Sequence, residues 1–261
     1  MEAKISALRQ LDTLTIIGFG SLMSAASARS TFATLGNFRV VRLRNFRRVF
    51  RHPAAVFFER GIADLGQKTM SSLCAERVLV SAAGATGATA GSVGFTAVAF
   101  DVKPADVDLH AFFLREEEFS LEFVPFTEVQ AKEGDDGGGG GGGGGGTGVQ
   151  TKATGLMCLA SSDEAFKQKW GEDVFECKYR AHGLDTIWGW DENSGILPCS
   201  VYLRHCVLAV NKPEFPASLR DSFLDETWLA DRKTTVRMYL NTHPEVMECK
   251  PPPSLAARYS G

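Results

Sequence analysis

The sequence has few of the features that bind metal ions or cross-link small secreted proteins. Its six cysteines occur singly, and neither they nor its five histidines follow metal-ligand spacing. Scattered cysteines with apolar neighbours are typical of buried thiols in a reducing compartment. No apolar run approaches the ~18 residues of a membrane span, and the first residues lack the apolar stretch of a secretory signal. We therefore expect a cytoplasmic protein with no metal site and no membrane contact.

The sequence also lacks a strong excess of either charge. The formal net charge is -3, which gives no general reason to expect nucleic acid or an acidic membrane as a partner. One segment, residues 38–51, does interleave six arginines with phenylalanines, as single-stranded nucleic-acid sites do. Flanking valines and leucines favour a strand with one solvated face instead. We expect no nucleic-acid binding.

Two segments of low complexity interrupt an otherwise ordinary globular composition. Hydrophobic residues make up 44% of the chain, enough to form a core. Ten consecutive glycines at 137–146, and the Ala/Gly/Thr-rich segment 82–91, have almost no side chains to bury. We therefore predict a single domain over residues 1–261, with mobile inserts at about 82–91 and 132–150. A helical C-terminal extension is predicted at about 216–247.

Short β-branched runs predict most of the secondary structure. Helices are predicted from Pro104 to Glu116, from Asp163 to about His182, and, as one or two amphipathic helices, over Ala217 to Leu240. Strands are predicted at 13–18, 38–50 (one or two strands), 73–81, 93–102, 121–129, 154–160 and 196–210. Strands and helices alternate without a regular pattern, so the sequence favours an α+β fold around one β core over a doubly wound sheet.

The first predicted strand ends in a glycine-rich segment, Gly18-Phe19-Gly20-Ser21-Leu22, called the glycine loop below. Alternating glycines let the chain turn tightly and expose successive backbone N–H groups, which suits a carboxylate or an oxyanion. An ordinary turn at the end of a strand explains the same residues. The third glycine of a dinucleotide-binding fingerprint is missing, and a methionine replaces the last glycine of a serine nucleophile elbow.

Three adjacent carboxylates, Glu116, Glu117 and Glu118, stand at the end of the helix predicted from Pro104. A solvated helix end would explain them. Acidic residues at a helix C-terminus nevertheless oppose the helix dipole, and such a misfit is where a functional carboxylate can be tolerated.

The order of these two features resembles the γ-glutamyl cyclotransferase-like family, in which a Gly-Tyr/Phe-Gly-Ser-Leu loop precedes an Arg-Glu carboxylate. The matching residues here are the glycine loop and, about 95 residues later, Arg115-Glu116. The resemblance covers residues 13–130 well and extends less surely to residue 210. It implies a small mixed β-barrel with helices packed outside. Phe19 is a departure, because many relatives carry tyrosine there.

The resemblance also implies a reaction that needs no cofactor. The α-amine of a small-molecule γ-glutamyl substrate attacks the side-chain amide, which forms 5-oxoproline and releases an amine or amino acid. Glu116 would transfer the protons, with Glu117 as the alternate if the match is displaced by one residue. Gly18, Phe19, Gly20, Ser21 and Leu22 would bind the substrate.

The sequence leaves a second function open. A chain that kept this fold and lost the reaction would act as a binding or assembly module. The C-terminal helices, in which charged residues stand beside apolar ones from Asp221 to Leu240, could contact a protein partner. Packing within the same domain is the competing explanation for these helices.

Overall fold

The computed structural model describes residues 1–78, 93–129 and 153–261. Both predicted inserts lie outside the described residues. The strands are β1 (Leu14–Gly18), β2 (Gly36–Arg44), β3 (Phe46–Pro53), β4 (Thr69–Arg77), β5 (Gly94–Val102), β6 (Ser120–Glu128), β7 (Ala153–Leu159), β8 (Leu197–Pro198) and β9 (Thr227–Leu229). The helices are α1 (Glu2–Leu8), α2 (Ala25–Arg29), α3 (Ala55–Glu59), α4 (Leu109–Arg115), α5 (Asp163–Trp170), α6 (Glu172–Lys178), α7 (Ser200–Val210), α8 (Ala217–Asp225) and α9 (Val236–Thr242). Short 3-10 segments occupy Ser21–Met23, Pro104–Asp106, Arg180–His182, Pro244–Glu248 and Pro253–Leu255.

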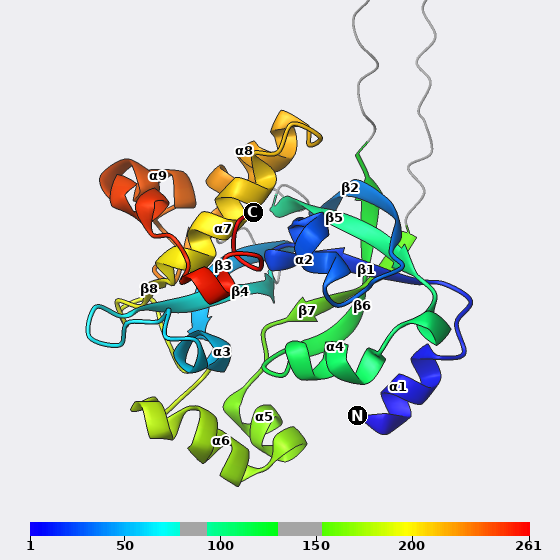
Figure 1. Ribbon diagram of the computed structural model, residues 1–261, viewed down its shortest axis with the longest axis horizontal. Coiled ribbons are helices and arrows are strands. Elements are labelled where there is room, and N and C mark those ends of the chain that lie inside the picture. The colour runs from blue at the N-terminus through cyan, green and yellow to red at the C-terminus, as the bar shows by residue number, and fades with distance from the viewer. Residues whose placement is uncertain (79–92, 130–152) are drawn as a thin grey trace, which may run out of the picture.

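Five strands close into a small barrel in the order β1-β5-β2-β6-β7. Most neighbours are antiparallel, and the barrel closes through a parallel contact between Ile16 of β1 and Leu156 of β7. Figure 1 shows the helices outside this barrel. The prediction of a small mixed β-barrel with helices outside is therefore confirmed.

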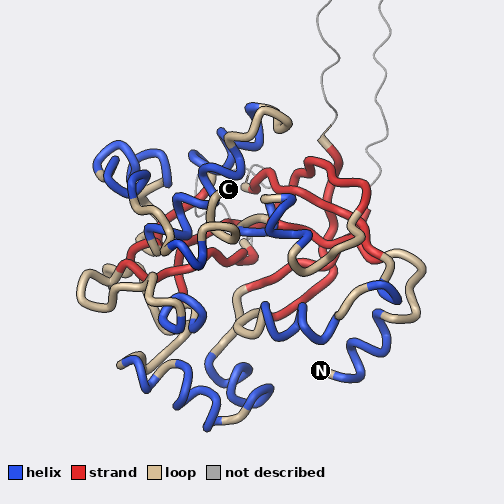
Figure 2. The backbone as a smooth tube through the Cα atoms, in the orientation of Figure 1, coloured by secondary structure: helices blue, strands red, loops and turns tan. Residues whose placement is uncertain are grey.

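A second sheet, which the sequence did not predict, lies beside the barrel in the order β8-β4-β3-β9. Figure 2 shows how the strands continue from the barrel into this sheet. The two are joined where β2 passes into β3 and where the Ala160 N–H donates to the Ala75 carbonyl at 2.9 Å. The segment expected as one or two strands is thus two strands in different sheets.

The predicted helix from Pro104 is wrong at its start. Pro104–Asp106 forms a separate 3-10 turn, and α4 begins only at Leu109, where the Asp108 side chain accepts from the Ala111 N–H at 3.0 Å. The next predicted helix does begin at Asp163, and Ser162 caps it, because its side chain accepts from the Ala165 N–H at 3.1 Å.

The predicted strand at 196–210 is mainly a helix. After the two-residue strand β8, α7 buries Leu203, Cys206, Val207 and Val210. These positions are three or four residues apart, which places them on one helical face. Further along, β9 separates α8 from α9 and adds an edge to the second sheet, so the expected helical extension is partly strand. Leu219 and Phe223 of α8 are buried against the rest of this chain.

Arg48, expected on a solvated strand face, is fully buried. Its guanidinium lies between the rings of Phe95 and Phe223, 4.8 Å from each centroid. It donates to the Thr227 hydroxyl at 2.6 Å and to three backbone carbonyls, those of Phe19 at 3.4 Å, Thr96 at 3.3 Å and Ser222 at 3.1 Å. Burial lowers the pKa of Arg48 to about 9, so the group stays charged near neutral pH.

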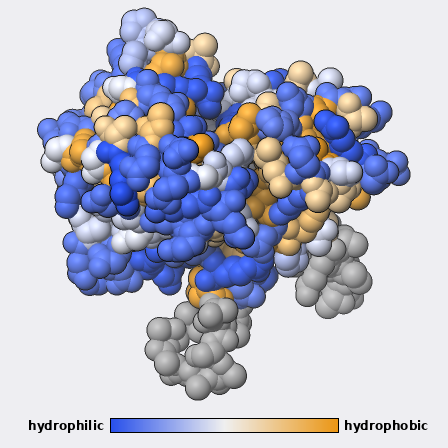
Figure 3. Space-filling view, turned by 90° about the horizontal axis from the view of Figure 1, so that it is seen from below, coloured by the Kyte–Doolittle hydropathy of each residue, from blue (hydrophilic) through white to orange (hydrophobic). Residues whose placement is uncertain are grey.

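Figure 3 shows one face that is largely hydrophilic, with apolar residues in smaller groups.

Four of the six cysteines are buried as free thiols, whereas Cys177 is exposed and Cys249 is intermediate. In the described ranges, no helix has the length and apolar character needed to cross a membrane.

Arg48 generates a stability prediction. Arg48→Met should lower the free energy of unfolding by about 3 kcal/mol or more, because several buried carbonyls lose their donor. Urea denaturation followed by fluorescence measures the change. Arg47→Met is the matched control, because Arg47 is the partly exposed neighbour on the same strand. Equal, small losses for both variants would contradict the role assigned to Arg48.

Candidate active site

A pocket of about 80 Å³ opens where β1 ends in the glycine loop. A cavity needs roughly 10–15 Å³ to hold one water molecule, so this pocket is large enough to admit a small polar group. The walls come from the glycine loop, α3, β4, the end of α4, β7, α7 and the segment at 258–259. The lining residues that matter below are Gly18, Phe19, Gly20, Ser21, Leu22, Arg115, Glu116, Glu118, Cys158, Tyr202, Arg258 and Tyr259.

The two glycines of the loop lie too close to other groups to carry a side chain. A Cβ on Gly20 would stand 2.4 Å from the Tyr202 hydroxyl, and one on Gly18 would stand 2.7 Å from Leu22 Cβ. Within the described residues, the N–H groups of Gly20 and Leu22 have no hydrogen-bond acceptor. Two backbone donors of this pocket-lining loop are therefore not used within the described residues, and such donors suit an anion.

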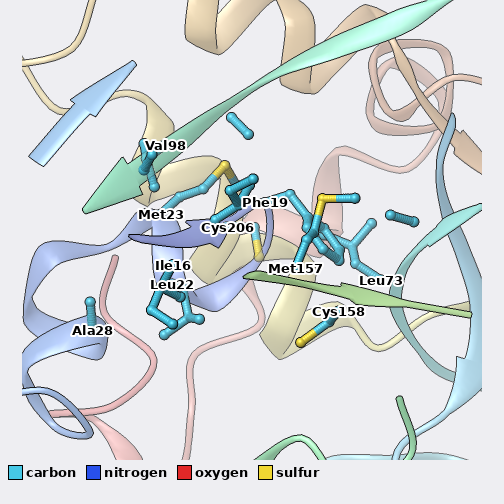
Figure 4. Close-up of a cluster of buried hydrophobic side chains, with 14 of the residues drawn as sticks. Ile16, Phe19, Leu22, Met23, Ala28, Leu73, Val98, Met157, Cys158 and Cys206 are labelled. Atoms are coloured by element: carbon cyan, nitrogen blue, oxygen red, sulfur yellow. The ribbon is translucent and has the colours of Figure 1, made fainter. Parts of the chain in front are cut away.

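Phe19 belongs to the hydrophobic core as well as to the loop. Its ring packs edge-on against Phe95, with centroids 5.9 Å apart. Figure 4 shows Phe19 in the same buried cluster as Leu73 and Met157, which come from neighbouring strands. The loop is consequently anchored by an apolar side chain.

Glu116 lies in the pocket with only 13% of its side chain exposed. Arg115 Nε contacts Glu116 Oε1 at 3.1 Å, and Arg115 Nη2 donates to the Ser21 hydroxyl at 2.9 Å. One guanidinium therefore joins the carboxylate to the glycine loop. On the other side, burial and the adjacent Glu116 carboxylate raise the pKa of the Cys158 thiol, which stays neutral.

Glu117 points elsewhere. Both of its carboxylate oxygens accept from Lys178 Nζ, at 2.6 and 2.8 Å. Glu117 lines a separate depression together with Lys4 and Lys169. The two carboxylates that the sequence could not separate thus belong to different environments, and only Glu116 lies with the glycine loop.

Glu118, which the sequence analysis did not single out, also lines the pocket. Its Oε1 accepts from the Tyr179 hydroxyl at 2.8 Å and from the Ala55 N–H at 3.2 Å. Burial raises the pKa of Glu118 to about 7, and the neighbouring Glu117 carboxylate acts in the same direction. Beside Glu116, the pocket therefore contains Glu118, whose carboxyl group changes charge near neutral pH.

Three more pocket residues come from far along the chain. Tyr202 of α7 accepts a hydrogen bond from the Ser21 N–H at 3.3 Å, and burial raises the pKa of this phenol. Arg258 and Tyr259 close another part of the wall. Tyr202 is one of the buried residues of α7. Its position in this apolar run was the one sequence signal that could have placed it near the core.

This arrangement can bind a small zwitterion and move a proton. Backbone N–H groups and arginines are available for a carboxylate, and Glu116 and Glu118 are available for an ammonium group. A carboxylate in such a pocket can also exchange a proton with a bound group. Over the described residues, no three His, Cys, Asp or Glu side chains come together in a way that could hold a metal ion.

Glu118 generates a pH prediction. Its pKa in the folded protein, about 7, lies above the ordinary value of 4.5, so its contribution to stability is complete below pH 4.5 and is lost as the pH rises through 7. Glu118→Gln should not lose this stability. As the pH rises from 4.5 to 7, the free energy of unfolding of the variant should therefore increase by up to about 3 kcal/mol relative to that of the wild type. Urea denaturation at several pH values measures it.

A matched control is Glu122→Gln. The side-chain hydrogen bond from Arg77 lowers the pKa of Glu122, so its small contribution is present above pH 4.5 and is lost as the pH falls. The two variants should therefore differ from the wild type in opposite directions. A Glu118→Gln profile parallel to that of the wild type would contradict the raised pKa.

Comparison with known proteins finds similar structures but no similar sequence. The sequence matches no family model and no curated protein. Among solved structures, the chain is similar to a glutathione-specific γ-glutamyl cyclotransferase from yeast, with 11% identity, a TM-score of 0.48, and coverage of 91% of this chain and 96% of that one. It is also similar to a γ-glutamyl cyclotransferase (8% identity, TM-score 0.35, 66% and 88% covered). A third similar structure is an uncharacterized protein from Homo sapiens (10%, 0.35, 67% and 89%).

Proposed function

We propose that this protein is a γ-glutamyl cyclotransferase-like enzyme that acts on a small γ-glutamyl compound without a cofactor. The observation that carries the proposal is that Glu116 and the glycine loop line the same pocket, although about 95 residues separate them in the sequence. Each was an ambiguous feature when taken alone. Arg115, which contacts both, makes them one unit.

The proposed reaction is intramolecular. The α-amine of the γ-glutamyl group attacks its own side-chain carbonyl carbon, a C–N bond forms, and the bond to the leaving nitrogen breaks. The products are 5-oxoproline and a free amine or amino acid, with no other reactant. Because the substrate supplies its own nucleophile, the protein's task is to hold the chain folded back on itself.

Glu116 would take, one at a time, the two protons that the α-ammonium group loses as it becomes the lactam N–H, and would pass them to the departing nitrogen, which leaves as an ammonium group. The Arg115 guanidinium holds this carboxylate at 3.1 Å and fixes its orientation. The free N–H groups of Gly20 and Leu22 would bind the α-carboxylate of the γ-glutamyl group. The Tyr202 hydroxyl accepts a hydrogen bond from the Ser21 N–H and so helps to fix the conformation of the glycine loop.

Glu116→Gln gives the direct test. The variant should release 5-oxoproline about 10²- to 10⁴-fold more slowly than the wild type, because the amide cannot accept a proton. Release from glutathione, γ-glutamyl amino acids and γ-glutamyl amines can be measured by liquid chromatography with mass detection.

Glu117→Gln is the matched control and should keep close to the wild-type rate, since Glu117 is bound to Lys178 outside the pocket. Loss of activity in Glu117→Gln, with activity retained in Glu116→Gln, would overturn the assignment of the acid/base residue. If the wild type converts none of the γ-glutamyl compounds, the proposed function itself is wrong.

A further inference from the structure

Arg258 lines the proposed active-site pocket from a segment outside the barrel. It is half-buried, whereas the Tyr259 side chain next to it is almost fully buried. Packing fixes this segment, because the Tyr259 hydroxyl accepts from Arg60 Nη1 at 2.9 Å and the Gly261 N–H donates to His205 Nδ1 at 3.0 Å. Figure 1 shows the C-terminal residues lying against α7.

The charge around Arg258 is unbalanced. Burial lowers the pKa of Arg258, and the positive charges of Arg115 and Arg60 lower it further. Arg115 has a carboxylate partner in Glu116. Neither Arg60 nor Arg258 has a carboxylate within 4.0 Å in the described part of the chain. A guanidinium held in a pocket wall among other cations favours a ligand with a negative charge.

The proposed reaction leaves one kind of anion for this position. The γ-glutamyl group carries an ammonium, assigned to Glu116, and a carboxylate, for which the glycine loop supplies the free donors of Gly20 and Leu22. Arg258 lines the same pocket from residues 258–259, whereas Arg115 and Glu116 reach it from the end of α4. With the glutamyl ammonium assigned to Glu116 and the glutamyl carboxylate to the glycine loop, the anion that remains for Arg258 is one on the amine that leaves.

Resting on the proposed function, we infer that Arg258 binds a carboxylate on the leaving part of the substrate. The preferred substrates are then γ-glutamyl amino acids or peptides with a free carboxylate, and not γ-glutamyl amines. Arg258 acts here as a specificity-determining residue, because it touches a part of the substrate that does not react.

Two matched pairs of compounds test the inference. γ-Glutamylalanine is compared with γ-glutamylethylamine, and glutathione with its C-terminal amide. Arg258→Met should lower kcat/KM for each carboxylate-bearing compound about 10- to 100-fold, mainly through KM, because a charge-assisted hydrogen bond is lost. It should leave kcat/KM for the partner without the carboxylate unchanged.

Arg220→Met is the control, because Arg220 is partly exposed, forms an ion pair with Asp221 and is absent from the pocket lining. It should not change either member of a pair. Thermal unfolding of both variants checks that the fold is kept. Calorimetric binding of glutathione and its amide to Glu116→Gln gives a readout that needs no turnover, and the carboxylate form should bind more tightly.

Each contrary result has a distinct meaning. Equal effects of Arg258→Met on both members of a pair, or no effect on either, would overturn the role of Arg258 and leave the proposed function intact. A substrate whose glutamyl α-carboxylate is an amide provides the third arm. If only that compound becomes insensitive to Arg258→Met, Arg258 binds the glutamyl carboxylate and the inference is wrong. If the wild type converts no compound, the proposed function fails first.

Discussion

The burial of one charged side chain links the parts of this molecule. Arg48 lies between the rings of Phe95 and Phe223, and it can remain there only if its donors find acceptors, because a buried cation without partners is costly. Those acceptors include the carbonyls of Phe19 and Ser222, in the glycine loop and in α8. The barrel, the second sheet and the C-terminal helices are therefore fixed relative to one another. The hydrogen bond from Arg48 to the Phe19 carbonyl holds the glycine loop, while the N–H groups of Gly20 and Leu22 have no acceptor within the described residues.

The sequence predicted the parts of the candidate site that are local in the chain. The glycine loop and Glu116 were visible because each is a short run of unusual residues beside a recognisable strand or helix. Tyr202 and Arg258 were not visible, and Glu118 could not be told from its two neighbours, because these residues reach the pocket only through tertiary packing. A glutamate in an acidic run, a tyrosine in an apolar run and an arginine near a proline-rich segment are ordinary residues until the fold brings them together.

The fold shows the same division. Strands such as β5 and β7 were predicted within a residue or two, because their apolar runs are short and end in turn-forming residues. The segment at 196–210 was assigned wrongly, since an apolar run with valines and a tyrosine fits a buried strand and a buried helix equally well. Arg48 was misplaced because the alternation of apolar and basic residues shows that a strand has two faces. It does not show whether other parts of the chain cover the face with the basic residues. Here Thr227 and the chain around Ser222 cover it.

The pocket joins segments that are far apart in the chain. The hydrogen bond from Ser21 to Tyr202 spans 181 residues, and the one from Arg60 to Tyr259 spans 199. Contacts of such separation require long loops to close, so they are costly to form early in folding. The five barrel strands can pair without either contact. A partly folded chain can thus contain a complete barrel and still have no binding site, and recovery of ligand binding would lag behind recovery of the barrel during refolding.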